Sequence, residues 1–244
     1  MGSGAGIFYG VGVGPGQAKM LPVAAFEALQ KADVIIAPRA RSSDFSIARQ
    51  CLVDLELDES RFREVIFNMD PEREQIDSHY ADMAQSIVQD LKNGKTVAYL
   101  TIGDSLTYST YSYLLSAIQE IFPGLAYRTF PGITSYAAAA SMVDFPLGQG
   151  KERMLILPCP DDVLQLKREI ETHDIVVLMK IGKRFADVIS LLQEMRIEKH
   201  CALVSRLGLS GEVVHSSLSD ILQTETLGYL TTMLIRKTAL KEKV

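Results

Sequence analysis

The chain has 244 residues, of which 47% are hydrophobic and 23% are charged, and its formal net charge is −5. This composition is that of an ordinary globular protein, long enough for one large domain or two smaller ones. The acidic balance excludes the general positive field that nucleic-acid binding favours, so we expect no nucleic-acid partner.

Apolar strands alternate with helical patterns in the first half of the chain. Strands are predicted at 6–14, 33–38, 63–69, 96–104 and 125–130, and helices at 21–32, 43–55, 70–94 and 110–121. The helix at 70–94 has Asp70 as a candidate cap, Pro71 at its first position and Gly94 at its end.

The second half repeats this rhythm without repeating the residues. Helices are predicted at 131–144, 161–173, 184–195 and 218–225, and strands at 153–158, 174–182, 200–208 and 229–237. Continuous Val, Ile and Leu strands between helices indicate α/β layers with buried, largely parallel sheets. The break at "FPG" predicts two α/β domains, 1–121 and 122–244.

Three cysteines, Cys51, Cys159 and Cys201, stand far apart and form no Cys-x-x-Cys pair. They predict reduced core thiols of a cytoplasmic protein and neither disulfides nor a zinc site. The chain contains no apolar run of about 18 residues, and its opening "MGSGAG" lacks the basic and apolar regions of a signal peptide. We therefore expect no membrane partner.

The first strand ends in "GVGVGPGQ" at 10–17. A dinucleotide fingerprint fails here because Pro15 or Gln17 falls on the third glycine position. "GKT" at 94–96 fails as a phosphate loop because Gln89 occupies the required glycine position. The remaining interpretation is a backbone with few side chains, which lets another object approach at the carboxyl end of a strand. A merely structural tight turn is the alternative.

Two further strands end in unusual loops. In "TIGDSLTYSTYSYL" at 101–114, Gly103 permits a turn of the backbone. Seven hydroxyl side chains follow at the start of a predicted helix, more than the capping of one helix requires. The surplus favours a polar ligand. "FPGITSYAAAASMVDFPLGQG" at 130–150 turns at Gly132 and continues into a helix of alanines, whose small side chains allow close approach of neighbouring elements.

In their order and spacing, these three loops resemble those of the tetrapyrrole methylase family. The resemblance covers essentially the whole chain, including "MKIGK", "SRLG" and "YLTTMLIRK". "GDSLTYSTYSYL" preceded by "EVIFNMDPERE" resembles the precorrin-2 C20-methyltransferase branch, although Ser105 replaces the proline of the usual Gly-Asp-Pro loop.

The resemblance implies two α/β domains with a ligand cleft between them and S-adenosyl-L-methionine as the methyl donor. The cofactor-binding residues implied by family position are Pro15, Ile102, Gly103, Asp104, Thr107, Thr134, Ser135, Met179, Gly208 and Thr232. Met179 ends an apolar strand and is equally explained as a core residue. The family also suggests a homodimer, which agrees with the frequency of twofold oligomers.

A tetrapyrrole carries many carboxylates, which arginine or lysine would hold. Arg39, Arg41 and Lys19 are the candidates, with solvated surface charge as the alternative for each. Asp104, Tyr108 or Tyr111 could take up the proton that the methylated carbon loses, and water is an alternative acceptor.

The four histidines, His79, His173, His200 and His215, show no ligand spacing, so we expect no metal site.

The family resemblance also leaves alternative substrates open, since relatives of the same fold methylate other tetrapyrrole positions, ribosomal RNA or a modified histidine of a translation factor. A nucleotide-dependent oxidoreductase is the alternative of a different class. The sequence does not distinguish a metal-free from a cobalt-containing substrate.

Overall fold

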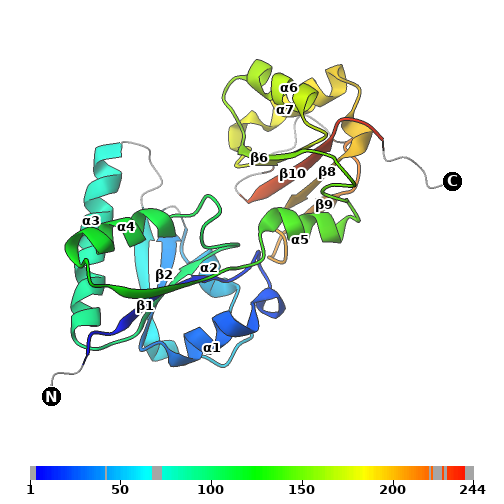
Figure 1. Cartoon of the computed structure of the whole chain (residues 1–244). Helices are drawn as coiled ribbons and strands as arrows, with labels where there is room; N and C mark the ends of the chain where they lie inside the picture. The colour runs from blue at the N-terminus through cyan, green and yellow to red at the C-terminus, as the bar shows by residue number, and fades with distance from the viewer. Residues whose placement is uncertain are drawn as a thin grey trace. The chain divides into compact units, whose positions relative to one another are not determined.

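The computed structural model describes residues 4–41, 43–67, 73–219, 221, 227 and 230–239, without the side chains of 67 and 73–79. The chain forms two compact units, Met1–Thr134 and Ser135–Val244 (Figure 1). The sequence instead suggested a division after Ile121. The strand at Ala126–Phe130 pairs with the first strand of the chain, which assigns it to the first unit.

The first unit holds a five-stranded sheet in the order β3-β2-β4-β1-β5. Its strands are β1 (Ile7–Gly12), β2 (Val34–Ala40), β3 (Phe62–Phe67), β4 (Val97–Thr101) and β5 (Ala126–Phe130). Its helices are α1 (Val23–Lys31), α2 (Ile47–Gln50), α3 (Arg73–Lys92) and α4 (Tyr111–Ile121), with short 3-10 turns η1 (Ala18–Met20) and η2 (Glu59–Arg61). Every strand pair is parallel, as predicted.

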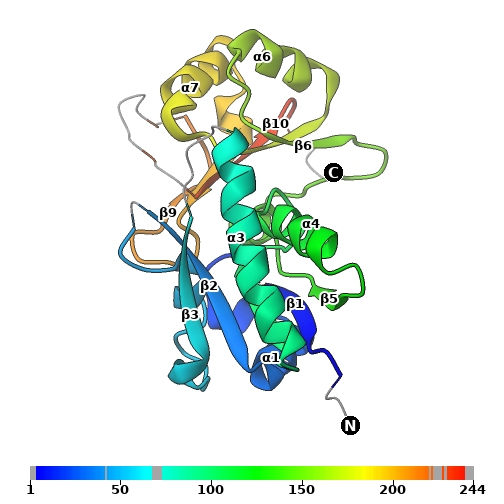
Figure 2. The ribbon, with the colours of Figure 1, turned by 90° about the vertical axis from the view of Figure 1, so that its left-hand side faces the viewer.

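Both faces of this sheet are covered. Helices α3 and α4 lie on one face and α1 on the other (Figures 1 and 2). On the α3 and α4 face, Phe8, Tyr99 and Leu114 belong to one buried cluster. Alternate residues of β4 point to opposite faces, and all of them are buried, which explains its unbroken apolar sequence.

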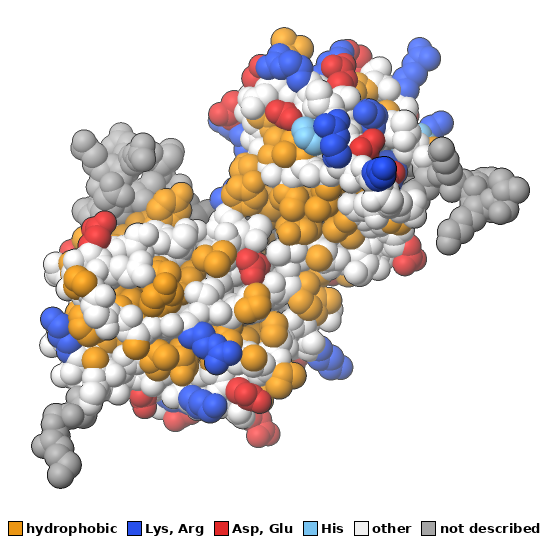
Figure 3. All heavy atoms as spheres, in the orientation of Figure 1, with side chains coloured by type: hydrophobic (Ala, Val, Ile, Leu, Met, Phe, Trp, Pro, Cys, Tyr) orange, Lys and Arg blue, Asp and Glu red, His pale blue; other side chains and the backbone are white. Residues whose placement is uncertain are grey.

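Edge strand β5 is less protected. Ala126, Tyr127 and Arg128 are exposed, and only Phe130 at its end is buried. Figure 3 shows many apolar and few charged side chains over this part of the first unit. Arg128 lies over the Phe130 ring at 4.7 Å, so its charge is partly covered by its own strand.

Several predicted helix limits need correction or confirmation. The helix expected at 43–55 is only α2, which begins where the Ser46 hydroxyl accepts a hydrogen bond from the Arg49 amide at 3.3 Å. Gly94 follows α3 with φ 81°, which confirms it as the end of that helix. The predicted cap Asp70 and first position Pro71 lie outside the described residues.

The second unit holds a five-stranded sheet in the order β6-β7-β10-β8-β9. Its elements are α5 (Ser135–Met142), β6 (Met154–Pro158), α6 (Val163–Thr172), β7 (Ile175–Met179), η3 (Gly182–Arg184), α7 (Phe185–Glu194), η4 (Glu198–His200), β8 (Cys201–Ser205), β9 (Val213–His215) and β10 (Thr231–Arg236). Among these strands only β6 and β7 pair in parallel.

The expectation of a largely parallel second sheet is therefore wrong. Strand β10 runs antiparallel between β7 and β8, and β9, which the sequence did not predict, pairs antiparallel with β8. Continuous apolar strands indicate burial on both faces but do not give strand direction. Most of the helix predicted at 218–225 lies outside the described residues. None of the described helices is long and apolar enough to cross a membrane.

Candidate active site

The first unit places three strand exits at one edge of its sheet. Strands β1 and β4 are neighbours, but β1 leads into α1 on one face and β4 into α4 on the other (Figure 1). Such a reversal opens a crevice at the carboxyl ends of the two strands. The exits are joined beyond the strands, because the amide of Gly103 donates to the Gly14 carbonyl at 2.8 Å and the amide of Gly14 donates to the Gly103 carbonyl at 3.1 Å.

The glycines at this edge differ in what they accommodate. A Cβ on Gly12 would lie 2.5 Å from the Gly132 amide nitrogen, and one on Gly10 would overlap the Tyr111 ring. The object that approaches these two glycines is therefore the protein itself, which corrects part of the interpretation from the sequence. Gly103 is different: its φ is 70°, and among the described residues a Cβ there would have only the Ile133 carbonyl oxygen within 4 Å, at 3.9 Å.

Asp104 connects two of the strand exits. Its Oδ1 accepts from the Leu106 amide at 3.0 Å and from the Thr107 hydroxyl at 2.9 Å. Its Oδ2 accepts from the Gly132 amide at 3.1 Å. The carboxylate thus shapes the loop after β4 and holds it against the loop after β5. Ile102, Gly103, Asp104 and Thr107 all lie in the segment that follows β4.

The hydroxyl-rich segment mostly bonds within the first unit, so the argument for a polar ligand from its surplus of hydroxyls is wrong. The Ser109 hydroxyl donates to the Ser105 carbonyl, and Thr110 bonds the Tyr99 hydroxyl at 2.9 Å. The Ser112 hydroxyl donates to the Ser109 carbonyl at 3.3 Å.

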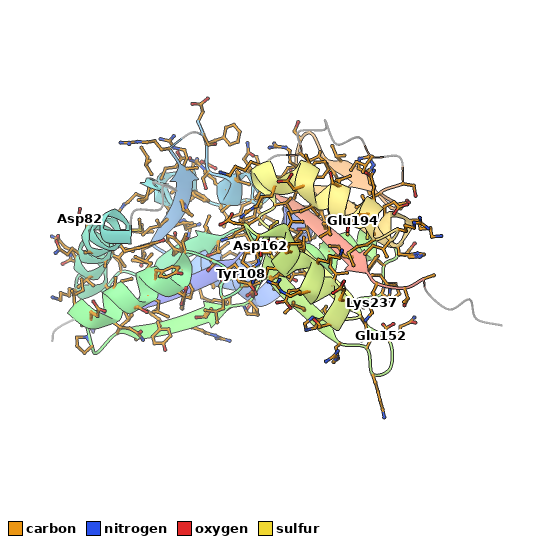
Figure 4. The ribbon with its side chains drawn as sticks, turned by 90° about the horizontal axis from the view of Figure 1, so that it is seen from above. Asp82, Tyr108, Glu152, Asp162, Glu194 and Lys237 are labelled. Atoms are coloured by element: carbon orange, nitrogen blue, oxygen red, sulfur yellow. The ribbon has the colours of Figure 1, made fainter. Side chains whose placement is uncertain are left out.

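Tyr111 lies in the core. It is fully buried, and its hydroxyl bonds Thr129 Oγ1 at 2.7 Å. Burial raises the pKa of this phenol, although the hydrogen bond from Thr129 opposes the shift. A phenol in this setting neither reaches the strand exits nor accepts a proton readily, so the structure does not support a catalytic role for Tyr111. Tyr108, labelled in Figure 4, lies in the β4–α4 loop and is 44% exposed.

The three candidate cations for substrate binding differ in their exposure and in their partners within the chain. Lys19 in η1 and Arg41 after β2 are exposed. Arg39 is less available, because its Nε lies 3.4 Å from Glu64 Oε2 and its guanidinium donates to the Ser43 carbonyl. Lys19 and Arg41 remain the better placed candidates for an anionic ligand.

Two further predicted cofactor residues lie in the first unit. Pro15 is buried beside the Gly14 turn, and Thr134 is partly buried at the end of the unit.

The second unit brings three predicted cofactor residues together. Met179 at the end of β7 stands opposite Thr232 in the ladder with β10. The Thr232 hydroxyl donates to Ser135 Oγ at 3.0 Å. Because β10 is antiparallel to β7, its first residues lie at the edge where β7 ends. Gly208 follows β8, which ends at this edge too, and its amide donates to Glu212 at 2.5 Å.

Sequence reasoning missed several hydroxyl groups at the strand ends. Thr101 Oγ1 at the end of β4 is buried and has no hydrogen-bond partner among the described residues. In the second unit the Thr231 hydroxyl donates to Ser205 Oγ at 2.9 Å, and both residues are buried. Their position as the last or first polar residue of an apolar strand is the signal that could have found them.

The remaining titratable residues lie outside these exits or form no ligand set. His173 stands 3.6 Å from Glu169 on α6. The side chain of His79 is not described. Three or more His, Cys, Asp or Glu side chains suited to a metal ion do not occur together in the described part of the chain. All three cysteines are buried and free, as predicted.

Comparison with known proteins identifies the class. Residues 8–222 match the family described as Tetrapyrrole (Corrin/Porphyrin) Methylases. The chain is 27% identical to the cobalt-precorrin-2 C(20)-methyltransferase of Salmonella typhimurium, over 95% of this chain and 97% of the relative. It is 32% identical to a probable cobalt-precorrin-2 C(20)-methyltransferase of Methanocaldococcus jannaschii, over 94% of this chain and 95% of the relative.

A solved structure shows the same fold. Uroporphyrin-III C-methyl transferase from Thermus thermophilus, complexed with S-adenyl homocysteine, superposes with a TM-score of 0.65 at 15% identity, over 95% of this chain and 92% of that one. The chain therefore belongs to the tetrapyrrole methylase family.

Proposed function

We propose that this protein transfers a methyl group from S-adenosyl-L-methionine to C20 of precorrin-2 or cobalt-precorrin-2, a step of cobalamin biosynthesis. The observation that carries the proposal is the match, over nearly the full length of both chains, to relatives named for this reaction. A methylase of the same fold acting on another tetrapyrrole position is the second candidate, since the fold is shared with a uroporphyrin-III methyl transferase.

The residues at the first unit's strand exits fit the methyl donor. Open space over Gly103 admits a ligand against the main chain, and the unpartnered Thr101 hydroxyl offers a buried hydrogen-bonding group at the same strand end. In the second unit, the hydroxyls of Thr232 and Ser135 beside Met179 offer a polar edge next to a thioether. Such a mixed apolar and polar lining suits a nucleoside with an amino-acid tail.

When bound, S-adenosylmethionine would supply an electrophilic methyl carbon on a sulfonium. Attack by the electron-rich C20 on that carbon would form the new carbon–carbon bond while the carbon–sulfur bond breaks and its electrons remain on sulfur. The residues of this chain therefore have to bind, orient and exclude water. Orientation alone contributes about 7–11 kcal/mol in such reactions.

Asp104 has a positioning role in this proposal. Both of its oxygens already accept hydrogen bonds from Leu106, Thr107 and Gly132, so the carboxylate fixes the shape of two exits at once. We assign the proton lost from C20 to water rather than to this carboxylate. Arg41 and Lys19 are the side chains proposed to meet substrate carboxylates, with Arg39 held in place by Glu64.

The proposal includes a homodimer in a reducing compartment such as the cytoplasm. The three free, buried thiols support the second part, since disulfides are rare there. Light scattering of the purified protein tests the oligomeric state: a mass of one 26.9 kDa chain would contradict the dimer.

Thermal unfolding in the presence of two ligands tests the cofactor. S-adenosylhomocysteine at about 100 times its dissociation constant should add about 2.7 kcal/mol to the free energy of unfolding, whereas NADPH at the same concentration should add nothing. Stabilisation by NADPH alone would favour the oxidoreductase alternative.

A further inference from the structure

Six described residues other than glycine have a left-handed backbone: Tyr108, Asp144, Lys180, Arg196, Arg206 and Leu230. Two of them simply end helices. Asp144 follows α5, where the Phe145 amide bonds the Ala140 carbonyl at 2.8 Å, and Arg196 follows α7 in the same arrangement. A left-handed residue is the ordinary way to end a helix.

Of the other four, three lie at strand ends in the second unit and one lies in a loop of the first unit. Lys180 follows β7, Arg206 follows β8, and Leu230 precedes β10. Tyr108, with φ 51°, lies between β4 and α4 in the first unit. Strained backbone persists where the surrounding structure holds it, and it concentrates at functional sites.

Tyr108 is the only aromatic residue among these six. A left-handed conformation costs about 1–2 kcal/mol for a residue with a Cβ, and glycine or asparagine would reduce that cost. Burial of the ring does not offset the cost in full, because 44% of the residue is exposed. Nearly half of Tyr108 is thus accessible to a ligand, beside its contacts within the chain.

Two more large apolar side chains are exposed next to Tyr108. Leu106, two residues earlier, is 63% exposed, and Ile133 in the loop after β5 is 40% exposed. The loops that carry them are joined by the hydrogen bond between Asp104 and the Gly132 amide. Three exposed apolar residues thus belong to the two loops that meet beside Gly103.

We propose that the Tyr108 ring contacts the face of the tetrapyrrole, with Leu106 and Ile133 extending the same apolar surface. A large tetrapyrrole macrocycle is recognised by aromatic and aliphatic side chains on its face and by cations at its carboxylates. The left-handed backbone holds the ring toward the ligand. This inference rests on the proposed function only for the ligand's class, not for the position that is methylated.

Two substitutions distinguish the contribution of the Tyr108 ring to ligand binding from the contributions of its hydroxyl group and of the strained backbone. Tyr108→Asn removes the ring and tolerates the left-handed backbone, so the thermal midpoint should stay equal or rise. Tyr108→Phe keeps the ring. Arg196→Asn is the matched control, because it places the same residue at an exposed left-handed position that ends a helix.

The readouts are the dissociation constants of anaerobically prepared, metal-free precorrin-2 and of S-adenosylhomocysteine, each by calorimetry. Tyr108→Asn should weaken precorrin-2 binding at least tenfold and change S-adenosylhomocysteine binding less than twofold. Tyr108→Phe and Arg196→Asn should stay within threefold of the wild type for both ligands.

Unchanged precorrin-2 binding in Tyr108→Asn, or an equal loss in Tyr108→Phe, would overturn the ring contact. Failure of the wild type to bind precorrin-2 would overturn it as well. A wild type that binds precorrin-2 but methylates a carbon other than C20 would refute the proposed function and leave this contact standing.

Discussion

Asp104 Oδ2 accepts a hydrogen bond from the Gly132 amide at 3.1 Å, across 28 residues of sequence. This bond connects the loop after β4 with the loop after β5 and lies beside the open space over Gly103. A single carboxylate therefore determines the shape of the exit at which we expect the methyl donor.

Asp104→Asn tests that relationship. The asparagine side chain has one acceptor oxygen and one NH₂ donor, so the backbone N–H of either Gly132 or Leu106 would face the NH₂ group instead of an acceptor. We expect a loss of about 1–3 kcal/mol in unfolding free energy and a dissociation constant for S-adenosylhomocysteine raised at least tenfold, measured by denaturant titration and calorimetry. Binding equal to that of the wild type would show that the loop does not depend on this carboxylate.

Gly12→Ala tests the backbone contact between exits. The new Cβ would lie 2.5 Å from the Gly132 nitrogen and 2.8 Å from the Gly103 carbonyl oxygen, which are backbone atoms that cannot move cheaply. We expect a loss of at least about 3 kcal/mol or failure to fold. Gly124→Ala is the control, since no atom of the described residues lies within 4 Å of a Cβ placed there. A Gly12→Ala protein as stable as this control would contradict the packing.

Thr232→Val tests the second unit's contribution to cofactor binding. The substitution keeps the shape and removes the hydrogen bond to Ser135. We expect S-adenosylhomocysteine to bind about 5–10 times more weakly, which corresponds to about 1 kcal/mol. Ser141→Ala on the exposed side of α5 should bind normally. The same affinity in both variants would remove Thr232 from the site.

Asp90 gives the first unit a dependence on pH. Burial raises the pKa of its carboxyl, but hydrogen bonds from Lys95 at 3.0 Å and Arg63 at 2.8 Å outweigh it, so the pKa is lower than usual. A lowered folded-state pKa stabilises above the unfolded value of about 3.9 and loses that effect as the pH falls through the folded value.

Asp90→Asn should therefore cost about 1–2 kcal/mol at pH 7 and progressively less as the pH falls below about 4. Urea titrations of both proteins at several pH values measure this difference. A cost that is independent of pH would assign the loss to packing instead of charge.

The buried thiols should be unreactive in the folded protein. Burial raises the pKa of Cys51 and of Cys201 to about 12, and it also raises that of Cys159. Because the thiolate is the reactive form, we expect a disulfide reagent at pH 8 to label none of these cysteines before unfolding and all of them after it. Rapid labelling of one thiol in the folded state would show local opening at that site.

The sequence predicted the first unit well because its apolar strands and helix ends are local features. It did not predict the boundary after Thr134 or the antiparallel β10, since both depend on which strand pairs with which. The exit loops were found from Gly103 and Asp104, whose backbone freedom and charge are visible in the sequence. The burial of Tyr111 could not be predicted from the sequence, because a tyrosine near a helix start gives the same pattern whether it faces the core or the solvent.

The interpretation of Gly12 failed for a related reason. A glycine shows that something approaches closely, but not whether that object is a ligand or the chain's own backbone. The same ambiguity applied to the hydroxyls of Thr110 and Ser109, which bond within their own unit.

Transfer of a labelled methyl group tests the central claim most directly. The purified protein would be incubated anaerobically with S-adenosylmethionine carrying a ¹³C methyl group and with either metal-free or cobalt-loaded precorrin-2, and the product would be analysed by NMR. We predict one new methyl signal, bonded to C20, with at least one of the two substrates. A label attached to a different ring carbon, or none transferred to either substrate, would contradict the account.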